Sequence, residues 1–358
     1  NHLKLNILGD LDIMEFMINV CIFEDEGYED LLPLTFARPA YDLLVGIDTI
    51  FDKIYRYFNY ANITLHCRSY LKPFVKTKYP DLAVNKINTG SMCLFINGRV
   101  LMNDELMSDL SQIDEDHNYL FTHQGEIVAM LVSGKELDHL EAMFCSVPNK
   151  ADLIQYLRPL SVSKEIKSLS IINNLWDLLS YNEETLVSDF RYFNQPGIIK
   201  GEIHPFSVIY KENNVFIDTG TVVEDFVVIN AKNGPVYIEE NVYIESGSRL
   251  EGPLFIGKNT KILGGKIKNS SIGPNCKVAG EINGSVFYQY SNKSHTGYIG
   301  NSYIGEWVNL GAQTTTSNLK NTYTEVKIDT GTQIINSGQL FLGSIIGDHV
   351  KTGINAVL

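Results

Sequence analysis

Short hydrophobic runs alternate with segments of helical periodicity over the first 195 residues. The apolar, β-branched runs that predict strands are 17–25, 63–68, 91–100 and 126–132. The segments that predict helices are 48–58, 70–80, 103–110, 149–158 and 164–190. Because strands and helices alternate, we expect an α/β, Rossmann-like domain with a mostly parallel sheet over residues 17–195.

A six-residue period replaces helical periodicity beyond Gln195-Pro196-Gly197. Clear hexads that start with an aliphatic residue are IDTGTV (217–222), IGKNTK (256–261), IGPNCK (272–277) and IGDHVK (346–351). A fixed period indicates a solenoid, and hexads indicate a triangular, left-handed parallel β-helix with aliphatic residues inside and Gly, Asn or Asp at the corners. A β-sandwich would instead show strict alternation and hairpin turns. We therefore expect a β-helix over residues 196–358.

The hexads are interrupted over residues 284–298 and 313–340, where we expect loops that leave the solenoid. The last coil starts at Ile346 and the sequence stops within it, so we expect further coils after Leu358. Residues 1–16 lack the features of a signal peptide, and we expect them to be a vector-derived leader.

Composition and charge argue against a nucleic-acid-binding protein and against a membrane-spanning one. The net charge of −13 lies almost entirely in the front half, and no basic stripe is present, which argues against a nucleic-acid partner. No apolar run reaches the roughly 18 residues of a membrane span. The five cysteines show no CxxC spacing, which is typical of reduced thiols in a cytoplasmic protein.

The stretch from Tyr290 to Asn318 combines hexads with chemically capable side chains. His295 precedes the hexad units 299–304 and 304–309, and a Gly-Ala pair at 311–312 follows them. An imidazole accepts a proton near neutral pH, so His295 is a candidate general base.

The chain resembles the putative sugar nucleotidyltransferases, a family similar to the bifunctional N-acetylglucosamine-1-phosphate uridyltransferase/glucosamine-1-phosphate acetyltransferase. The motifs that carry the resemblance are FEDEGYEDLLPLTFARPAYDLLVG (23–46), FINGR (95–99), SNKSHTGYIGNSYIGEWVNLGAQTTTSNL (291–319) and GDHVKTGIN (347–355). The resemblance implies an enzyme of nucleotide-sugar biosynthesis that uses sugar phosphate, a nucleoside triphosphate with Mg²⁺, and acetyl-CoA. It also implies a homotrimer with acyl transfer between subunits.

The resemblance assigns roles in the second half residue by residue. His295 falls on the family's general base, while Tyr298 and Asn309 fall on its sugar-binding tyrosine and asparagine. The candidates for thioester and amine contact are Gly311, the backbone N–H of Ala312, and Asn318. The family's phosphate-binding cations fall on Gly265 and Asn283, which are uncharged; Lys293 is a nearby candidate, and the acceptor need not be a sugar phosphate.

The front half departs further from the family pattern. FEDEGYED stands where a Gly-rich loop would bind a triphosphate, and Pro39-Ala40 replaces a Pro-Lys pair. The remaining candidates for nucleotide or sugar-phosphate binding are Thr35, Arg38, Asn97 and Arg99, and a Mg²⁺ site would need Asp25, Asp104 or Asp177.

Several alternatives remain open on sequence grounds. His295 could be a corner histidine bonded to the backbone, Asn309 could belong to an asparagine ladder, and Asp177 could pack with Trp176. His204, His295 and His349 could bind zinc between subunits, but they lie many coils apart. In a second hypothesis, the front domain is a degenerate nucleotide- or sugar-phosphate-binding module on a trimeric scaffold. The sequence does not name the sugar, the base or the acyl acceptor.

Overall fold

The computed structural model describes residues 19–88, 92–114, 116–330 and 333–358. They form two compact units. One contains the described residues up to Glu26 together with Ile54–Leu169, and the other contains Gly27–Lys53 and Ser170–Leu358. The expected leader, residues 1–16, lies outside the described residues. The segments 27–53 and 170–195, which we expected within the front domain, group with the β-helix unit.

The front unit is an α/β domain built on a seven-stranded mixed sheet, in the order β10-β8-β9-β6-β1-β4-β5. Its strands are β1 (Asn19–Phe23), β4 (Asn62–His66), β5 (Ala83–Val84), β6 (Cys93–Asn97), β8 (Asn118–His123), β9 (Glu126–Val132) and β10 (Ser161–Glu165). The strand β1 runs parallel to both β4 and β6, while β9 runs antiparallel to its neighbours. This confirms the Rossmann-like α/β prediction.

Helices α4 (Lys135–Met143) and α5 (Lys150–Leu157) pack on one face of this sheet. Their leucines face buried residues of the central strands, including Phe23 and Phe95. The front unit also holds α2 (Lys72–Lys78) and α3 (Asp104–Leu110), and the boundary between the two units falls within α1 (Ile50–Phe58). None of the described helices combines the length and hydrophobicity that crossing a membrane requires.

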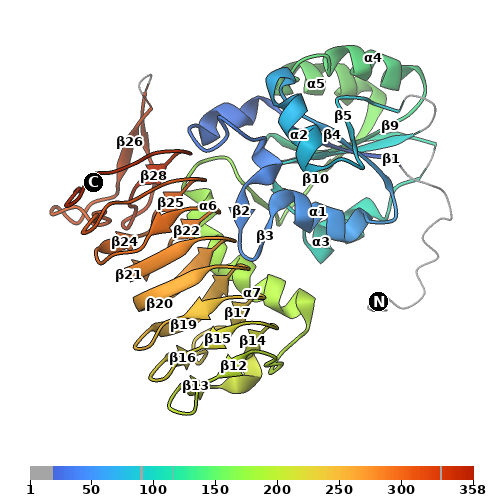
Figure 1. Ribbon diagram of the computed structural model, residues 1–358. Helices are drawn as coiled ribbons and strands as arrows, with labels where there is room; N and C mark the ends of the chain where they lie inside the picture. The colour runs from blue at the N-terminus through green and yellow to red at the C-terminus, as the bar shows by residue number, and fades with distance from the viewer. Residues whose placement is uncertain (1–18, 89–91, 115, 331–332) are drawn as a thin grey trace. The chain divides into compact units, whose positions relative to one another are not determined.

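The second unit is a parallel β-helix whose coils stack from β12 (Glu202–Ile203) to β28 (Ile345–Ile346) (Figure 1). Its remaining parallel strands are β13 (Val208–Tyr210), β14 (Val215–Ile217), β15 (Val222–Val223), β16 (Val228–Asn230), β17 (Val236–Ile238), β18 (Tyr243–Ile244), β19 (Arg249–Ile256), β20 (Lys261–Ile272), β21 (Lys277–Asn283), β22 (Val286–Phe287), β23 (Asn292–Lys293), β24 (Tyr298–Gly300) and β25 (Tyr303–Ile304). Strand pairing repeats along three faces, so each residue has a fixed neighbour one coil later. The β-helix prediction is confirmed.

Aliphatic side chains fill the β-helix in columns. One column joins residues that pair in successive coils and are all buried: Ile217, Ile238, Ile256, Ile272, Phe287, Ile304 and Ile346. Each such side chain contributes about 1.5–3 kcal/mol through burial. At one corner, Asn241, Asn259 and Asn275 have positive φ angles of 57°, 59° and 59°, a conformation that asparagine tolerates better than most residues. These columns explain the hexad pattern.

The structure corrects three details of the sequence interpretation. The helix predicted over 164–190 is wrong in its first half, where strands β10 (Ser161–Glu165) and β11 (Ser170–Ile171) lie; the helices of this region are α6 (Asp177–Ser180) and α7 (Asn182–Phe193). Residues 284–298 form an ordinary coil, because aromatic and serine residues replace aliphatic ones without breaking the register. The insertion begins after Asn318 and contains the hairpin of β26 (Lys327–Asp329) and β27 (Ile334–Asn336), which projects from the coils in Figure 1.

The segment 27–53 packs against the β-helix. Its hairpin of β2 (Leu44–Val45) and β3 (Asp48–Thr49) exchanges hydrogen bonds with the coils: Ser271 Oγ donates to the Gly46 carbonyl at 2.7 Å, and the Leu44 N–H donates to Tyr303 Oη at 3.1 Å. The buried pair of Lys53 and Asp189, at 2.6 Å, ties the segment to α7.

Candidate functional site

His295 lies at a corner of the β-helix, between β23 and β24. Asn292 pairs with Asn309 one coil later, a separation of 17 residues, and the same register places His295 beside Ala312. The Gln313 N–H confirms this register because it donates to the Thr296 carbonyl at 2.9 Å. The imidazole of His295 is exposed and has no hydrogen-bond partner within the described parts of the chain.

The neighbouring corner offers a free backbone donor. The Ala312 N–H has no acceptor among the residues described, whereas the Ala312 carbonyl accepts the Asn355 N–H at 2.8 Å. Gly311 has a packing role here: its N–H donates to Thr352 Oγ1 at 3.0 Å, and an added Cβ would lie 2.5 Å from the Gly353 carbonyl oxygen. Only glycine therefore lets the two coils approach this closely. The corner can present a proton acceptor and an N–H donor side by side.

A polar face continues from this corner along β24. Asn318 Nδ2 donates to Tyr298 Oη at 3.1 Å and to Asn301 Oδ1 at 2.8 Å, so two of the predicted substrate-binding residues contact each other. Asn301 was missed in the sequence. The same 17-residue separation that relates Asn292 to Asn309 could have identified it, because Asn301 lies 17 residues before Asn318.

Asn309 occupies the position that its ladder interpretation requires. Its Oδ1 accepts a hydrogen bond from Asn292 Nδ2 at 2.6 Å. Its own Nδ2 has no acceptor in the described residues and so remains available as a donor. The ladder and a substrate-binding role are therefore compatible.

Lys293 lies inside the β-helix, not on its surface. The side chain is 0% exposed, and Nζ donates to the carbonyl oxygens of His295 and Thr296 at 2.7 and 3.0 Å. Burial lowers the pKa of this amine to about 8. In this conformation the ammonium does not reach a substrate phosphate.

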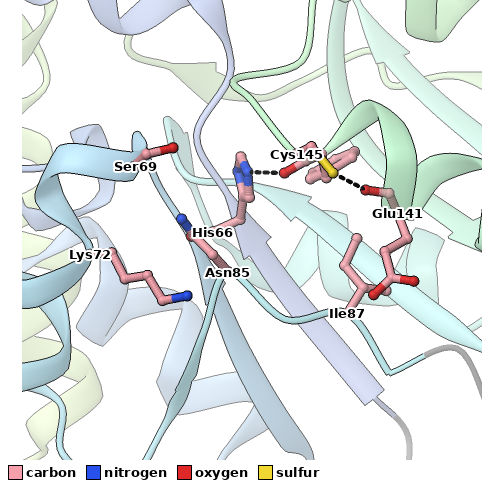
Figure 2. Close-up of a pocket in the computed structure, with 8 residues that line it drawn as sticks. His66, Ser69, Lys72, Asn85, Ile87, Glu141 and Cys145 are labelled. Atoms are coloured by element: carbon pink, nitrogen blue, oxygen red, sulfur yellow. Dashed lines mark hydrogen bonds between the residues drawn. The ribbon is translucent and has the colours of Figure 1, made fainter.

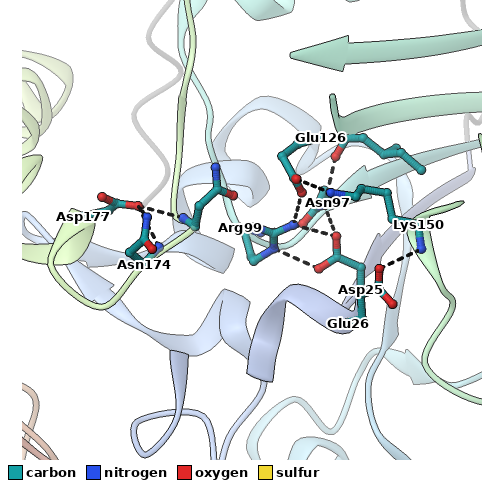
Figure 3. Close-up of polar contacts among 10 residues, drawn as sticks. Asp25, Glu26, Asn97, Arg99, Glu126, Lys150, Asn174 and Asp177 are labelled. Atoms are coloured by element: carbon teal, nitrogen blue, oxygen red, sulfur yellow. Dashed lines mark hydrogen bonds and ion pairs between the residues drawn. The ribbon is translucent and has the colours of Figure 1, made fainter. Parts of the chain in front are cut away.

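The predicted nucleotide-binding residues of the front unit bind one another (Figure 3). Arg99 Nε and Nη2 donate to the two carboxylate oxygens of Asp25 at 2.8 and 2.7 Å, and Asn97 Nδ2 donates to Asp25 Oδ2 at 2.8 Å. Arg99 Nη2 also donates to Glu126 Oε2 at 2.8 Å. The two carboxylates raise the pKa of Arg99 above its already high ordinary value, against the opposing effect of burial.

Glu126 and Lys150 complete this charged cluster and were missed in the sequence. Lys150 Nζ forms an ion pair with Glu126, and both cations and the hydrogen bonds to them lower the pKa of that carboxyl although burial opposes the shift. No local motif in the sequence predicts this ion pair, because Glu126 and Lys150 come from separate segments of the chain.

Thr35 and Arg38 are held within the β-helix unit. Thr35 Oγ1 donates to the Tyr28 carbonyl at 2.8 Å. The Arg38 guanidinium is 2% exposed, donates to Glu306 and Asp348 at 3.0 and 2.5 Å, and stacks on the Tyr288 ring at 3.9 Å. Both carboxylates belong to coil corners, so the guanidinium joins segment 27–53 to two coils.

The candidate metal ligands do not form a metal site in this arrangement. Tyr57 Oη donates to Asp104 at 2.9 Å, and Asp177 Oδ2 accepts the N–H groups of Asn173 and Asn174 at 2.9 and 2.7 Å. Asp25 is neutralised by Arg99. Among the described residues, no three His, Cys, Asp or Glu side chains are placed to hold a metal ion, so the Mg²⁺ assignment stays a prediction.

A cavity of about 350 Å³ lies at the carboxyl end of β4 (Figure 2). Its lining is mixed: His66, Ser69, Lys72, Asn85, Ile87, Glu141, Phe144 and Cys145. His66 is 2% exposed, its Nε2 donates to the Phe144 carbonyl at 2.9 Å, and burial lowers its pKa to about 4. The neutral ring therefore keeps Nδ1 as an acceptor, and no donor within the described structure reaches it.

Comparison with known proteins now adds to this geometry. Residues 20–196 match the family model described as sugar nucleotidyl transferase. This match covers just under half of the chain and shows that residues 20–196 are similar to a sugar nucleotidyl transferase domain. This domain includes the front sheet and also segment 27–53, which packs on the β-helix.

Two of the relatives that the chain matches are described as bifunctional proteins. It is 32% identical over 227 residues to a bifunctional sugar-1-phosphate nucleotidylyltransferase/acetyltransferase of Sulfurisphaera tokodaii, covering 58% of this chain and 52% of that protein. It is 28% identical over 380 residues to the bifunctional protein GlmU of Methanococcus aeolicus, covering 90% and 86%. The alignment thus spans about half of the first relative and most of the second.

Proposed function

We propose that the β-helix transfers the acyl group of acetyl-CoA to the amine of a sugar, with His295 as general base. The observation that carries this proposal is the coil register, which puts the exposed His295 imidazole beside the Ala312 N–H, a donor without an acceptor among the described residues. Acyl transfer needs both groups: a proton acceptor for the amine, and a donor for the oxyanion that forms on the thioester carbonyl.

The proposed reaction balances with groups at this corner. The sugar amine attacks the thioester carbon, His295 accepts the proton that the amine loses, and the negative charge develops on the carbonyl oxygen near the Ala312 N–H. The C–S bond then breaks, and coenzyme A leaves as its thiol after receiving the proton from His295. Tyr298 and Asn318, which bond to each other after the corner, and Asn309, which pairs with the strand before it, would orient the sugar.

The test is thiol release from acetyl-CoA by the full-length protein, with a panel of amino sugars and amino-sugar phosphates. His295→Gln should lower the rate with the active acceptor by about 10²–10⁴-fold, the usual contribution of general base catalysis. The matched control is His349→Gln, because His349 is also an exposed histidine at a β-helix corner. A His295→Gln variant with the wild-type rate would refute the proposal.

For the sugar nucleotidyl transferase domain, we propose binding of a sugar phosphate and a nucleotide, followed by nucleotidyl transfer with release of pyrophosphate. The family match and the bifunctional relatives support this. The cavity at β4 supports nucleotide binding, because it lies at the carboxyl end of a parallel strand, has an apolar wall and is also lined by the cation Lys72.

A second candidate, binding without turnover, is favoured by the charged cluster around Arg99. Asp25, the candidate metal ligand nearest the end of β1, already forms two hydrogen bonds with Arg99 and one with Asn97. Calorimetry with nucleoside triphosphates, sugar phosphates and Mg²⁺ should be combined with a coupled pyrophosphate assay. Pyrophosphate release establishes the transferase, whereas binding without release establishes the module.

A separate variant tests whether the nucleotide binds in the cavity at β4. Lys72→Met should weaken nucleotide binding about 10- to 150-fold if the ammonium contacts phosphate, since charge-assisted hydrogen bonds contribute about 1.5–3 kcal/mol. Lys76→Met is the control, because Lys76 lies one turn later on α2 and does not line the cavity. Equal affinities of the two variants would place the nucleotide elsewhere.

We further propose that the protein is a cytoplasmic homotrimer. Exposed aromatic side chains on the β-helix coils, among them Phe226 and Trp307, favour burial against another subunit. All five cysteines are free, which fits a reducing compartment. Light scattering on the full-length protein would test the trimer.

A further inference from the structure

Lys293 occupies a position that the β-helix otherwise fills with aliphatic residues. Strand pairing places it in the inward column of Ile244, Ile262 and Val278, and each of these side chains is 0% exposed. The next residue of this column is Leu310, in the coil that pairs with Asn292. A lysine is therefore inserted into an apolar core, at the coil that carries His295.

The buried ammonium has no carboxylate partner in the part of the chain that the structure describes. Its partners are the carbonyl oxygens of His295 and Thr296. Burying a charge without a counterion is unfavourable, and an apolar side chain of similar length would avoid this cost. Stability of the core alone does not account for a lysine here.

The two carbonyls belong to the corner that presents the candidate base. Because both oxygens accept hydrogen bonds from Lys293 Nζ, they point into the β-helix, and the peptide planes on each side of Thr296 are fixed. The corner has little space to adopt another conformation: Gly297 has φ 133°, and a Cβ there would lie 2.3 Å from the Thr314 carbonyl oxygen and 3.0 Å from Lys293 Nζ.

The His295 ring depends on this backbone for its orientation. No side chain within the described residues hydrogen bonds the imidazole, so the ring has no direct orienting partner. We propose that Lys293 is a positioning residue that holds the 294–297 corner from inside the β-helix and so aims His295 at its substrate. This inference rests on the proposed acyl transfer for its catalytic meaning, but the ordering of the corner can be measured without catalysis.

The decisive variant is Lys293→Met, which keeps the length and apolar stem of the side chain and removes its donors. Acyl transfer should fall about 10- to 100-fold in kcat, the usual effect of misplacing a catalytic group by about 1 Å, while the KM for acetyl-CoA stays unchanged. The melting temperature should change little, because removal of the buried charge offsets the loss of the hydrogen bonds to the two carbonyl oxygens. Val278→Met is the matched control, because it alters the same column one coil earlier; it should leave kcat within about twofold.

A second readout separates this inference from the proposed function. Amide hydrogen exchange at residues 295–297 should accelerate at least tenfold in Lys293→Met and stay unchanged in Val278→Met. If the wild type releases no thiol but exchange changes as stated, the acyl-transfer proposal fails and the positioning of the corner stands. If exchange is unchanged, the inference is wrong whatever the activity.

A structural role would give a different pattern. Loss of melting temperature and kcat in parallel, or failure of both Lys293→Met and Lys293→Leu to fold, would show that the lysine is required for the fold and overturn the inference. Retained kcat in a folded Lys293→Met protein would also overturn it.

Discussion

The sequence predicts functional side chains in two regions of the molecule. These regions differ in whether their polar groups are exposed or bonded to one another. At the β-helix corner, the His295 ring is exposed and the Ala312 N–H is unpaired among described residues. At the carboxyl ends of β1 and β6, Asp25, Asn97 and Arg99 are at most 2% exposed and bond to one another. The first region presents its polar groups outward, and the second satisfies them internally.

The difference follows from how each fold determines which side chains become neighbours. In the β-helix, backbone pairing fixes which residues meet from coil to coil, and outward side chains stand on a surface that cannot close over them. In the α/β domain, side chains at strand ends project into a space whose shape is set by loops, so opposite charges can pair. A motif at a coil corner is therefore more informative about geometry than a motif at a strand end.

Among the variants that test this comparison, Arg99→Met is expected to have the largest effect on the free energy of unfolding. It leaves Asp25 buried without its cation, and breaking one side of a buried ion pair typically costs about 3–5 kcal/mol in the free energy of unfolding. Urea denaturation at pH 7 would measure the loss.

The double variant Asp25→Asn/Arg99→Met is the control for this cluster, because it removes both charges and should recover most of the stability. Should Arg99→Met keep wild-type stability but lose nucleotide binding, the cluster would be a ligand site, and the contrast with the β-helix corner would disappear.

The fold could be predicted from the sequence, whereas several contacts at the candidate site could not, and particular residues illustrate the physical reasons. The column from Ile217 to Ile346 is visible in the hexad spacing, because its inward residues are aliphatic except for Phe287. The contact of Arg38 with Glu306 and Asp348 is not visible, since it joins positions 268 and 310 residues apart without a shared motif. The burial of Lys293 was also missed, although its place in the Ile262–Val278 column follows from the register.

Acidification should weaken the front unit through His66. Burial lowers the folded-state pKa of this histidine from 6.5 to about 4, so between these values the unfolded chain binds the additional proton. Stability therefore rises with pH across this window and is lost on acidification, by roughly 3 kcal/mol between pH 7 and pH 4.

Urea denaturation of the wild type and His66→Gln across this pH range isolates the effect, because the variant lacks the titrating group. His117→Gln is the control: His117 is exposed, and its hydrogen bond to Asp114 raises its pKa, so it contributes with the opposite sign. Hydrogen exchange should locate the loss in β4. An equal pH dependence in the wild type and His66→Gln would contradict the assignment.

The smallest expected effect comes from variants that distinguish the hydrogen bond of the asparagine ladder from substrate binding at the β-helix corner. Asn292→Ala and Asn309→Ala each remove the same hydrogen bond, so each should cost about 0.5–1.5 kcal/mol in stability. Only Asn309→Ala also removes the unpaired Nδ2 donor, so it alone should raise the KM for the sugar acceptor, about five- to tenfold for a neutral hydrogen bond of this strength. Thermal denaturation and steady-state kinetics on both variants measure the two effects. Equal KM values for the two variants would reduce Asn309 to a structural residue and leave His295, Ala312 and the Tyr298–Asn318 pair as the site.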